Sequence, residues 1–197
     1  KKGNIWVGTW ADGITVFSPK ENIYRHFRHD PNNAGSLSNN NAYAIHEDRE
    51  GNIWVGTYGN GLDLYHPETG TFSHYSYDDK DPEYVNSRKI HSIFEDREGG
   101  LWLGTDGGGL NYFDKKTHRF NRYIHQDGRN SISDNRVFEI YEDGTGNLWI
   151  GTMNGLNYFD RQTREFRVCT TVYGLPNNVI YGILPGSKDQ LWISTNK

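Results

Sequence analysis

A tryptophan-centred motif recurs along this chain and constrains its fold more than any other feature. The sequence GNIWVGT stands at residues 3–9 and again at 51–57, and close variants of it occupy 99–105, 146–152 and 189–195. The tryptophans of the motif are Trp6, Trp54, Trp102, Trp149 and Trp192. A period of about 40–50 residues, made of short strands and turns, indicates a radial or stacked β architecture. Because the sequence begins and ends inside a repeat, we expect it to be a piece of a longer protein.

Each repeat contains four short apolar segments separated by turns. In the repeat at residues 41–77, these segments lie at 42–48, 52–57, 62–66 and 71–77, and the turns between them read REG, YGNG and PETG. Short strands joined by hairpin-sized turns predict an antiparallel meander. Apolar residues show no helical spacing, so we expect no helices.

The second strand of each repeat is apolar on both sides of the pleat, as in IWV at residues 53–55. A strand in a two-layer sandwich would keep one polar face, whereas a strand between stacked blades is covered on both. The sequence therefore predicts an all-β fold, a β-propeller with four-stranded antiparallel blades, and about 4 to 4.5 blades in a single domain. With the strands of a blade named A to D in chain order, the boundaries are strands B–D of one blade at 3–28, full blades at about 41–77, 87–125 and 135–172, and strands A–B of a further blade at 178–197.

Composition narrows the class of protein. Apolar residues make up only 34% of the chain, but 14% is aromatic, and a few large rings per repeat substitute for many aliphatic side chains. A net charge of −4 without a basic run argues against nucleic-acid binding. The single Cys169 excludes an intrachain disulfide and is predicted to be a buried, inert thiol. No apolar run is long enough to span a bilayer, and the first residues read as a strand, so we expect any targeting signal upstream.

The connections between strands fall into a uniform and a varied set. The A–B and C–D turns are alike between repeats, whereas the D–A connections and the B–C turns differ, and in a propeller the varied set lies on one face. Variable loops on a regular scaffold are where recognition usually occurs, although drift in unconstrained loops is an alternative explanation. Aromatic residues at two otherwise polar B–C turns favour recognition, because exposing them has a cost. The residues expected to line this face are Trp10, Asp12, Tyr58, Asn60, Asp106, Asn154, Arg88 and Arg136, together with Asn39, Asn40, Asn135 and Asn178. Such a mixture suits a polyhydroxylated ligand, an oligosaccharide or another small polar molecule.

Motifs for catalysis, metals or cofactors are weak or missing in the sequence. The Glu-Asp pairs at 47–48, 95–96 and 142–143 are predicted to shape turns, with the aspartate accepting hydrogen bonds from backbone donors. The histidines do not have the spacing of metal ligands, and we expect them to be solvated residues on strands. The glycines at 104–109 join two strands rather than opening a helix, so they do not predict phosphate binding. We expect no catalytic residues, no metal and no cofactor.

The repeats resemble a known family. The sequence NRVFEIYEDGTGNLWIGTMNGLNYFD at residues 135–160 is similar to the two-component regulator propeller repeat, and the similarity recurs through essentially the whole chain. The resemblance implies the periplasmic sensor region of a hybrid two-component system of the Bacteroidetes type, in which propellers precede a membrane helix, a histidine kinase and a response regulator. In that family the sensor detects a glycan breakdown product and activates polysaccharide-utilisation genes. Kinase motifs are missing from these residues, so no enzymatic activity is assigned to them.

Three functions remain open at this stage. The first is a ligand-sensing module whose conformational equilibrium shifts when a glycan binds. The second is a propeller scaffold for protein–protein contacts without a small ligand, including a homodimer in which the strand at 179–184 completes a blade of the partner. The third is a propeller polysaccharide lyase or glycosidase, for which Asp12 and Asp106 are the only carboxylates in corresponding turns.

Overall fold

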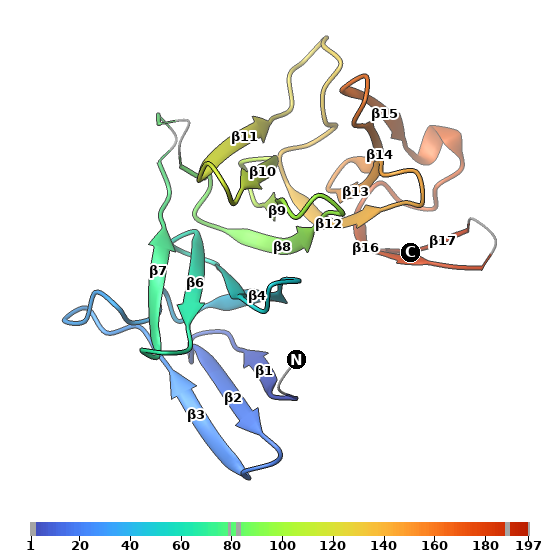
Figure 1. Cartoon of the computed structure of the whole chain (residues 1–197). Helices are drawn as coiled ribbons and strands as arrows, with labels where there is room; N and C mark the ends of the chain where they lie inside the picture. The colour runs from blue at the N-terminus through green and yellow to red at the C-terminus, as the bar shows by residue number, and fades with distance from the viewer. Residues whose placement is uncertain (1–2, 79, 82–83, 188–189, 197) are drawn as a thin grey trace.

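Short antiparallel strands joined by turns and loops form the regular secondary structure of the described residues, apart from one short 3-10 turn (Figure 1). The computed structural model describes residues 3–78, 80–81, 84–187 and 190–196, so the predicted loop at 78–88 and the predicted turn at 185–190 lie partly outside the described residues. Within these described ranges the strands form five sheets, and in each sheet the strands that are neighbours in sequence pair. These are β1 (Ile5–Gly8), β2 (Ile14–Ser18) and β3 (Ile23–Phe27); β4 (Ala42–Glu47), β5 (Ile53–Thr57), β6 (Leu62–His66) and β7 (Thr71–Tyr75); β8 (Ile90–Glu95), β9 (Leu101–Thr105), β10 (Leu110–Asp114) and β11 (Arg119–Tyr123); β12 (Val137–Glu142), β13 (Leu148–Thr152), β14 (Gly155–Asp160) and β15 (Glu165–Cys169); and β16 (Ile180–Pro185) with β17 (Leu191–Thr195).

The five sheets are successive blades of a β-propeller, as the sequence predicts. Within the described residues, the first strands of the blades, β4, β8, β12 and β16, contact one another in order and so face a common axis. Figure 1 shows the blades following each other in an open arc, from blue at the N-terminus to red at the C-terminus. The sequence predicts no helices, and the part of the chain that the structure describes contains one turn of 3-10 helix, η1 (Thr171–Tyr173), in the last D–A connection.

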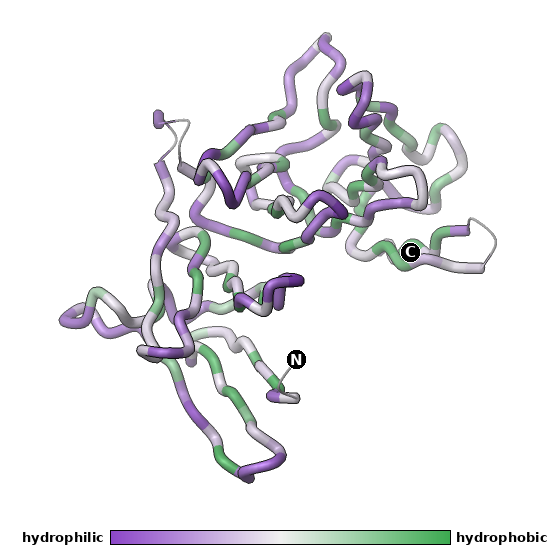
Figure 2. The backbone as a smooth tube through the Cα atoms, in the orientation of Figure 1, coloured by the Kyte–Doolittle hydropathy of each residue, from purple (hydrophilic) through white to green (hydrophobic). Residues whose placement is uncertain are grey.

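The core lies between the blades. All five residues of β9 are buried, which confirms the double cover expected for this strand. The ring of Trp54 packs 5.6 Å from that of Phe113 in the next blade, and Trp102 lies 6.0 Å from Phe159 in the blade after it. At the end of the arc the same motif position is uncovered, and Trp192 is 69% exposed. Hydrophobic stretches follow the strands, and the long connections are mainly hydrophilic (Figure 2).

The contact between blades requires the glycine that lies two residues after the motif tryptophan. A Cβ atom on Gly56 would lie 2.7 Å from Cγ2 of Ile90, and one on Gly104 would lie 2.9 Å from Cγ1 of Val137. Both neighbours are at the start of the first strand of the following blade. The motif therefore encodes a close approach of strand B to the next strand A, which only glycine allows.

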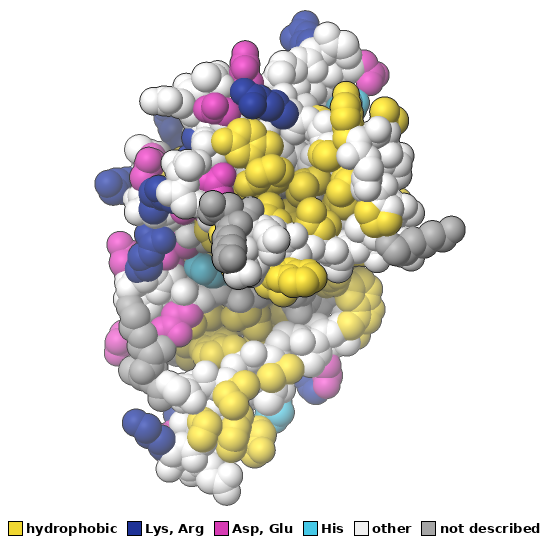
Figure 3. Space-filling model, turned by 90° about the vertical axis from the view of Figure 1, so that its right-hand side faces the viewer, with side chains coloured by type: hydrophobic (Ala, Val, Ile, Leu, Met, Phe, Trp, Pro, Cys, Tyr) yellow, Lys and Arg dark blue, Asp and Glu magenta, His cyan; other side chains and the backbone are white. Residues whose placement is uncertain are grey.

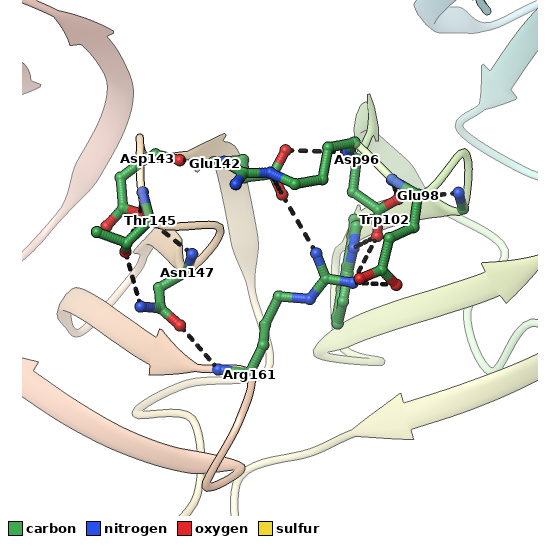
Figure 4. A network of polar contacts seen from close by, with 10 residues as sticks. Asp96, Glu98, Trp102, Glu142, Asp143, Thr145, Asn147 and Arg161 are labelled. Carbon is green, nitrogen blue, oxygen red and sulfur yellow. Dashed lines mark hydrogen bonds and ion pairs between the residues drawn. The ribbon is translucent and has the colours of Figure 1, made fainter.

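The acidic residues of the A–B turns join neighbouring blades, as Figure 4 shows for two of them. Asp96 Oδ2 accepts a hydrogen bond of 2.9 Å from Trp102 Nε1, and its other oxygen accepts one from the N–H of Gly100. Arg161, in the C–D turn of the following blade, lies 2.9 Å from Asp96 Oδ2 and 3.2 Å from Glu142 Oε1. This geometry confirms the turn role predicted for the Glu-Asp pairs and adds an inter-blade ion pair that the sequence did not reveal.

Candidate functional site

A β-bulge near the start of strand A places one side chain of each blade towards its neighbours. The register shifts between Ala42 and Ala44, Ile90 and Ser92, Val137 and Glu139, and Ile180 and Gly182. The residue inside each bulge is Tyr43, His91, Phe138 or Tyr181. A bulge leaves its extra residue outside the ladder and turns its side chain. Since strand A is the innermost strand, these four rings lie along the inner edge of the arc.

The bulged rings touch one another from blade to blade. The centroid of His91 lies 5.2 Å from that of Tyr43 and 5.2 Å from that of Phe138, and both pairs are nearly parallel. Phe138 lies 4.9 Å from Tyr181. We call this continuous set, with the two turn residues described next, the aromatic row.

Two predicted residues extend the aromatic row at its other end. Tyr58, in the B–C turn after β5, stacks on His91 at 5.6 Å and lies 5.9 Å from Tyr43. The ring of Trp10, 65% exposed, lies 5.3 Å from that of Tyr58. The aromatic row therefore consists of Trp10, Tyr58, Tyr43, His91, Phe138 and Tyr181, and each of the five blades contributes to it.

Asp106 is the polar centre beside Tyr58. Its Oδ2 accepts a hydrogen bond of 2.6 Å from the Tyr58 hydroxyl, and its Oδ1 accepts one of 2.8 Å from Nε of Arg136. Nζ of Lys89 lies 3.4 Å from Oδ2 and 4.8 Å from the centroid of the Tyr58 ring. Burial would raise the pKa of Asp106, but the hydrogen bonds from Tyr58 and Arg136 outweigh it and lower that pKa to about 2. Asp106 is therefore ionised at neutral pH and holds one phenol and two cations in place.

The strand ladder explains why these groups meet. Tyr58 forms a bridge with Lys89, and Asp106 forms the equivalent bridge with Arg136, so each B–C turn pairs with the entry to the next strand A. The N–H of Gly59 donates to the Arg88 carbonyl, and that of Gly107 donates to the Asn135 carbonyl. These bonds place the B–C turns beside the D–A connections on one face, as the sequence predicts.

The other predicted residues lie outside this group. Asp12 pairs with Arg28 at 2.7 Å, and the guanidinium of Arg88 lies 5.0 Å from the ring of Tyr77. The Asn154 side chain accepts a hydrogen bond of 3.4 Å from Asn178, and the Asn60 N–H donates to Thr57 Oγ1 within its own turn.

The predicted asparagines in the D–A connections make loop contacts. Asn40, Asn135 and Asn178 each accept a hydrogen bond from a backbone N–H at the start of the same connection, at 2.7 to 2.8 Å. Asn39 accepts one from the N–H of Asn41. The shared Ser/Asn-rich end of these loops is therefore explained by loop closure.

Sequence reasoning missed Lys89 and the four bulged rings. The four bulged rings could have been found from the sequence, because each is the second residue of strand A in its repeat. Burial lowers the pKa of His91, which favours its neutral form within the stack of rings. In the described part of the chain, no three His, Cys, Asp or Glu side chains gather as a metal site, and no helix is long and apolar enough to cross a membrane.

The fold, together with the face formed by the B–C turns and the D–A connections, defines a β-propeller in which each blade is one copy of a repeated sequence. Residues 36–59, 84–107, 131–154 and 174–197 match the family model of the two component regulator propeller, and the chain belongs to that family. No curated protein matches the chain in sequence.

Solved structures with the same fold include two extracellular domains and an enzyme. The extracellular domain of a hybrid two component system from B. thetaiotaomicron is 26% identical, with a TM-score of 0.81 over 98% of this chain and 24% of that one. The extracellular domain of a one component system from the same organism is 24% identical, with a TM-score of 0.79 over 99% of this chain and 25% of that one. Virginiamycin B lyase from Staphylococcus aureus is 16% identical, with a TM-score of 0.72 over 98% of this chain and 60% of that one, and it shares the fold alone. The chain thus spans about a quarter of the length of these extracellular domains.

Proposed function

We propose that this chain is a ligand-sensing module in the periplasmic part of a hybrid two-component system, and that its ligand is an oligosaccharide. The observation that carries the proposal is the pair of neighbouring rings, exposed Trp10 and half-buried Tyr58, next to the Asp106 centre. Rings offer flat apolar surfaces to the C–H faces of a sugar, and the carboxylate, the guanidinium and the ammonium offer acceptors and donors to its hydroxyls. In the complete receptor, binding would shift a conformational equilibrium that controls a histidine kinase and, through it, polysaccharide-utilisation genes.

The charges of the site do not favour hydrolysis as the function. A glycosidase needs one carboxyl group that stays protonated to act as general acid. Asp106 has a pKa of about 2 and is held by Tyr58 and Arg136, and Asp12 is paired with Arg28. Asp106 is therefore not set up to donate a proton at neutral pH.

Calorimetric titration with neutral oligosaccharides tests the proposal. Tyr58→Ala and Trp10→Ala should each weaken binding about fivefold, because each removes one stacking surface worth roughly 1 kcal/mol. Tyr24→Ala is the matched control, since Tyr24 is an exposed ring on β3 that stacks on Phe17, outside the aromatic row. Equal losses in all three variants, or no saccharide binding to the wild type, would remove the proposal.

A second function, protein–protein contact, is favoured by exposed apolar side chains at sheet edges. Ile5 and Val7 on β1 and Trp192 on β17 are about half or more exposed. Figure 3, which views the molecule from the right-hand side of Figure 1, shows hydrophobic side chains on both sides of a hollow. Under this function the chain would self-associate or bind a protein through these edges, and a monomeric mass by light scattering would exclude the homodimer.

A further inference from the structure

The D–A connection between the first two blades, at residues 29–41, is held against the outer strand of the second blade. The N–H of Phe72 on β7 donates to the Gly35 carbonyl at 2.8 Å, and Nε2 of His74 lies 2.9 Å from the Ala34 carbonyl. Figure 1 shows this loop extending beside the start of β7. The loop therefore reaches from the first blade to the outer edge of the second before the chain enters β4.

Both ring nitrogens of His74 face an oxygen atom. Nδ1 lies 2.8 Å from Oδ1 of Asp63, whose side chain is 0% exposed, and Nε2 faces the loop carbonyl of Ala34. A neutral imidazole has one N–H and can donate to only one of these oxygens, whereas an imidazolium donates to both. The hydrogen bond to Asp63 is the main cause that raises the pKa of His74. The protonated ring is therefore the form that bridges β6 and the loop.

Among the described residues, Asp63 is the charged group that lies against His74. The second oxygen of Asp63 accepts a hydrogen bond of 2.8 Å from the N–H of Ser38, so the carboxylate holds the loop as well. Other titratable groups of the loop and of the two strands have partners of their own: Asp30 the N–H of Asn32, His29 the Leu37 carbonyl, and His66 the Ser73 hydroxyl. The His29 contact requires a single N–H, which a neutral ring supplies. His74 is thus the group whose contact with the loop depends on a second proton.

The next two blades hold the equivalent loops with a different pair of residues. The pairs that stand opposite each other in register are His74 and Asp63, Arg122 and Asn111, and Val168 and Asn157. Arg122 donates to three carbonyls of the loop that precedes its blade, those of Asp78, Asp81 and Tyr84. In the fourth blade the side-chain oxygen of Asn157 accepts a hydrogen bond of 2.9 Å from the N–H of Ser133. A guanidinium keeps its charge and an amide has none, so of these three loops only the one at residues 29–41 is held by a titratable pair.

The same loop also holds the turns that carry Trp10 and Tyr58. The Asn41 side chain accepts a hydrogen bond of 2.7 Å from the N–H of Ala11, next to Trp10. The Asn41 carbonyl accepts one of 2.8 Å from the N–H of Tyr58. A loop that is anchored at residues 34–38 restricts Asn41 more than a loop that is free there. The anchoring of the loop is therefore coupled to both rings.

We infer that His74 is a proton-dependent latch: its imidazolium anchors residues 34–38 to the second blade, and loss of the proton releases them and loosens the turns of Trp10 and Tyr58. After deprotonation the remaining N–H stays with Asp63, because a carboxylate is the stronger acceptor, and the lone pair of Nε2 then faces the loop carbonyl. Since the folded-state pKa of His74 lies above 6.5, the latch is closed below pH 6.5 and opens as the pH rises through that pKa. The inference goes beyond the proposed function and does not depend on the ligand.

Amide hydrogen exchange followed by NMR tests the latch without any ligand. The N–H of Phe72 donates to the loop, and the matched control is Phe166, the equivalent residue of the fourth blade, whose N–H donates to the Asn130 side chain at 2.7 Å. Hydroxide accelerates exchange at both amides alike, so the ratio of the two rates isolates the anchoring of the loop. Between about pH 5.5 and 8.5, exchange at Phe72 relative to Phe166 should rise by about fivefold, the factor expected for the loss of one hydrogen bond. The midpoint of this rise should equal that of the His74 ring titration in the same samples.

Two variants copy residues of the following blades. His74→Arg introduces the permanent cation of the third blade and should keep the exchange ratio low over the whole pH range. Asp63→Asn introduces the amide of the third and fourth blades, retains an acceptor for Ser38, and should move both midpoints to lower pH. A ratio that stays constant while the His74 ring titrates would overturn the inference, as would an Asp63→Asn midpoint equal to that of the wild type. Saccharide binding enters none of these measurements, so a failure of the proposed function leaves their outcome unchanged.

Discussion

Lys115 joins two blades, and its replacement by methionine should destabilise the propeller strongly. Its ammonium lies 2.9 Å from Asp48 Oδ2 and 3.0 Å from Glu95 Oε1, and the side chains of these two acids are 0% and 4% exposed. Burial alone would lower the pKa of Lys115, but its bonds to Asp48 and Glu95 raise it, so the group is fully charged at neutral pH. Methionine preserves the length of the side chain and removes the ammonium from Asp48, whereas Glu95 keeps Nε of Arg49 at 3.8 Å.

The size of the effect follows from the burial of the partners. Removing one member of a buried ion pair costs about 3–5 kcal/mol, because the remaining charge stays desolvated. Asp48 keeps its hydrogen bonds from Trp54 and Asn52, so we expect a loss near the lower limit, about 3 kcal/mol. For a domain of this size that loss lowers the Tm by about 10 °C.

Urea unfolding followed by circular dichroism measures the difference. Lys116→Met is the matched control, because the neighbouring Lys116 is exposed and its replacement should change stability by less than about 0.5 kcal/mol. A loss below about 1 kcal/mol, or the same loss in both variants, would refute the reasoning that the bridge holds the blades together.

Three further predictions concern packing, titration and the ligand face. Gly104→Ala should lower stability by about 1–3 kcal/mol in urea unfolding, because its Cβ would clash with the next blade, whereas Gly144→Ala meets no atom within 4 Å and should be neutral. The pKa of His74 is raised above 6.5, chiefly by its hydrogen bond to a buried carboxylate, so its contribution to stability should be complete below pH 6.5 and lost as the pH rises through its folded-state pKa. A proton titration by NMR and the pH dependence of the Tm in His74→Gln check this, and a His74 pKa at or below 6.5 would contradict it. Tyr58→Phe should raise the pKa of Asp106 above its value of about 2, and an unchanged carboxyl titration by NMR would show that the hydroxyl does not stabilise the carboxylate.

The blade architecture was predictable because it is encoded locally. Each repeat carries its own alternating strands and hairpin turns. Because strand B is apolar on both faces, its sequence predicts that a neighbouring blade covers it. The motif glycine at residue 104 also reflects the packing between blades, because it lies where the next strand A approaches strand B. Trp10, Tyr58 and Asp106 could be selected as candidates from the sequence for a related reason. They differ from one another at the same position of repeated turns, and such a difference between repeats is visible in the sequence.

The composition of the site was decided only by the tertiary structure. Arg136 reaches Asp106 because one B–C turn bridges to the next strand A, whereas Asp12, in an equivalent turn, pairs with Arg28 instead. The row through His91 and Phe138 depends on a bulge, which shifts the alternation of side chains by one residue and turns what reads as an ordinary strand position towards the axis. The sequence by itself determined what each blade is, because a blade folds from neighbouring residues. Which side chains meet between blades depends on how the blades pack around the axis, and that geometry exists only once the arc has formed.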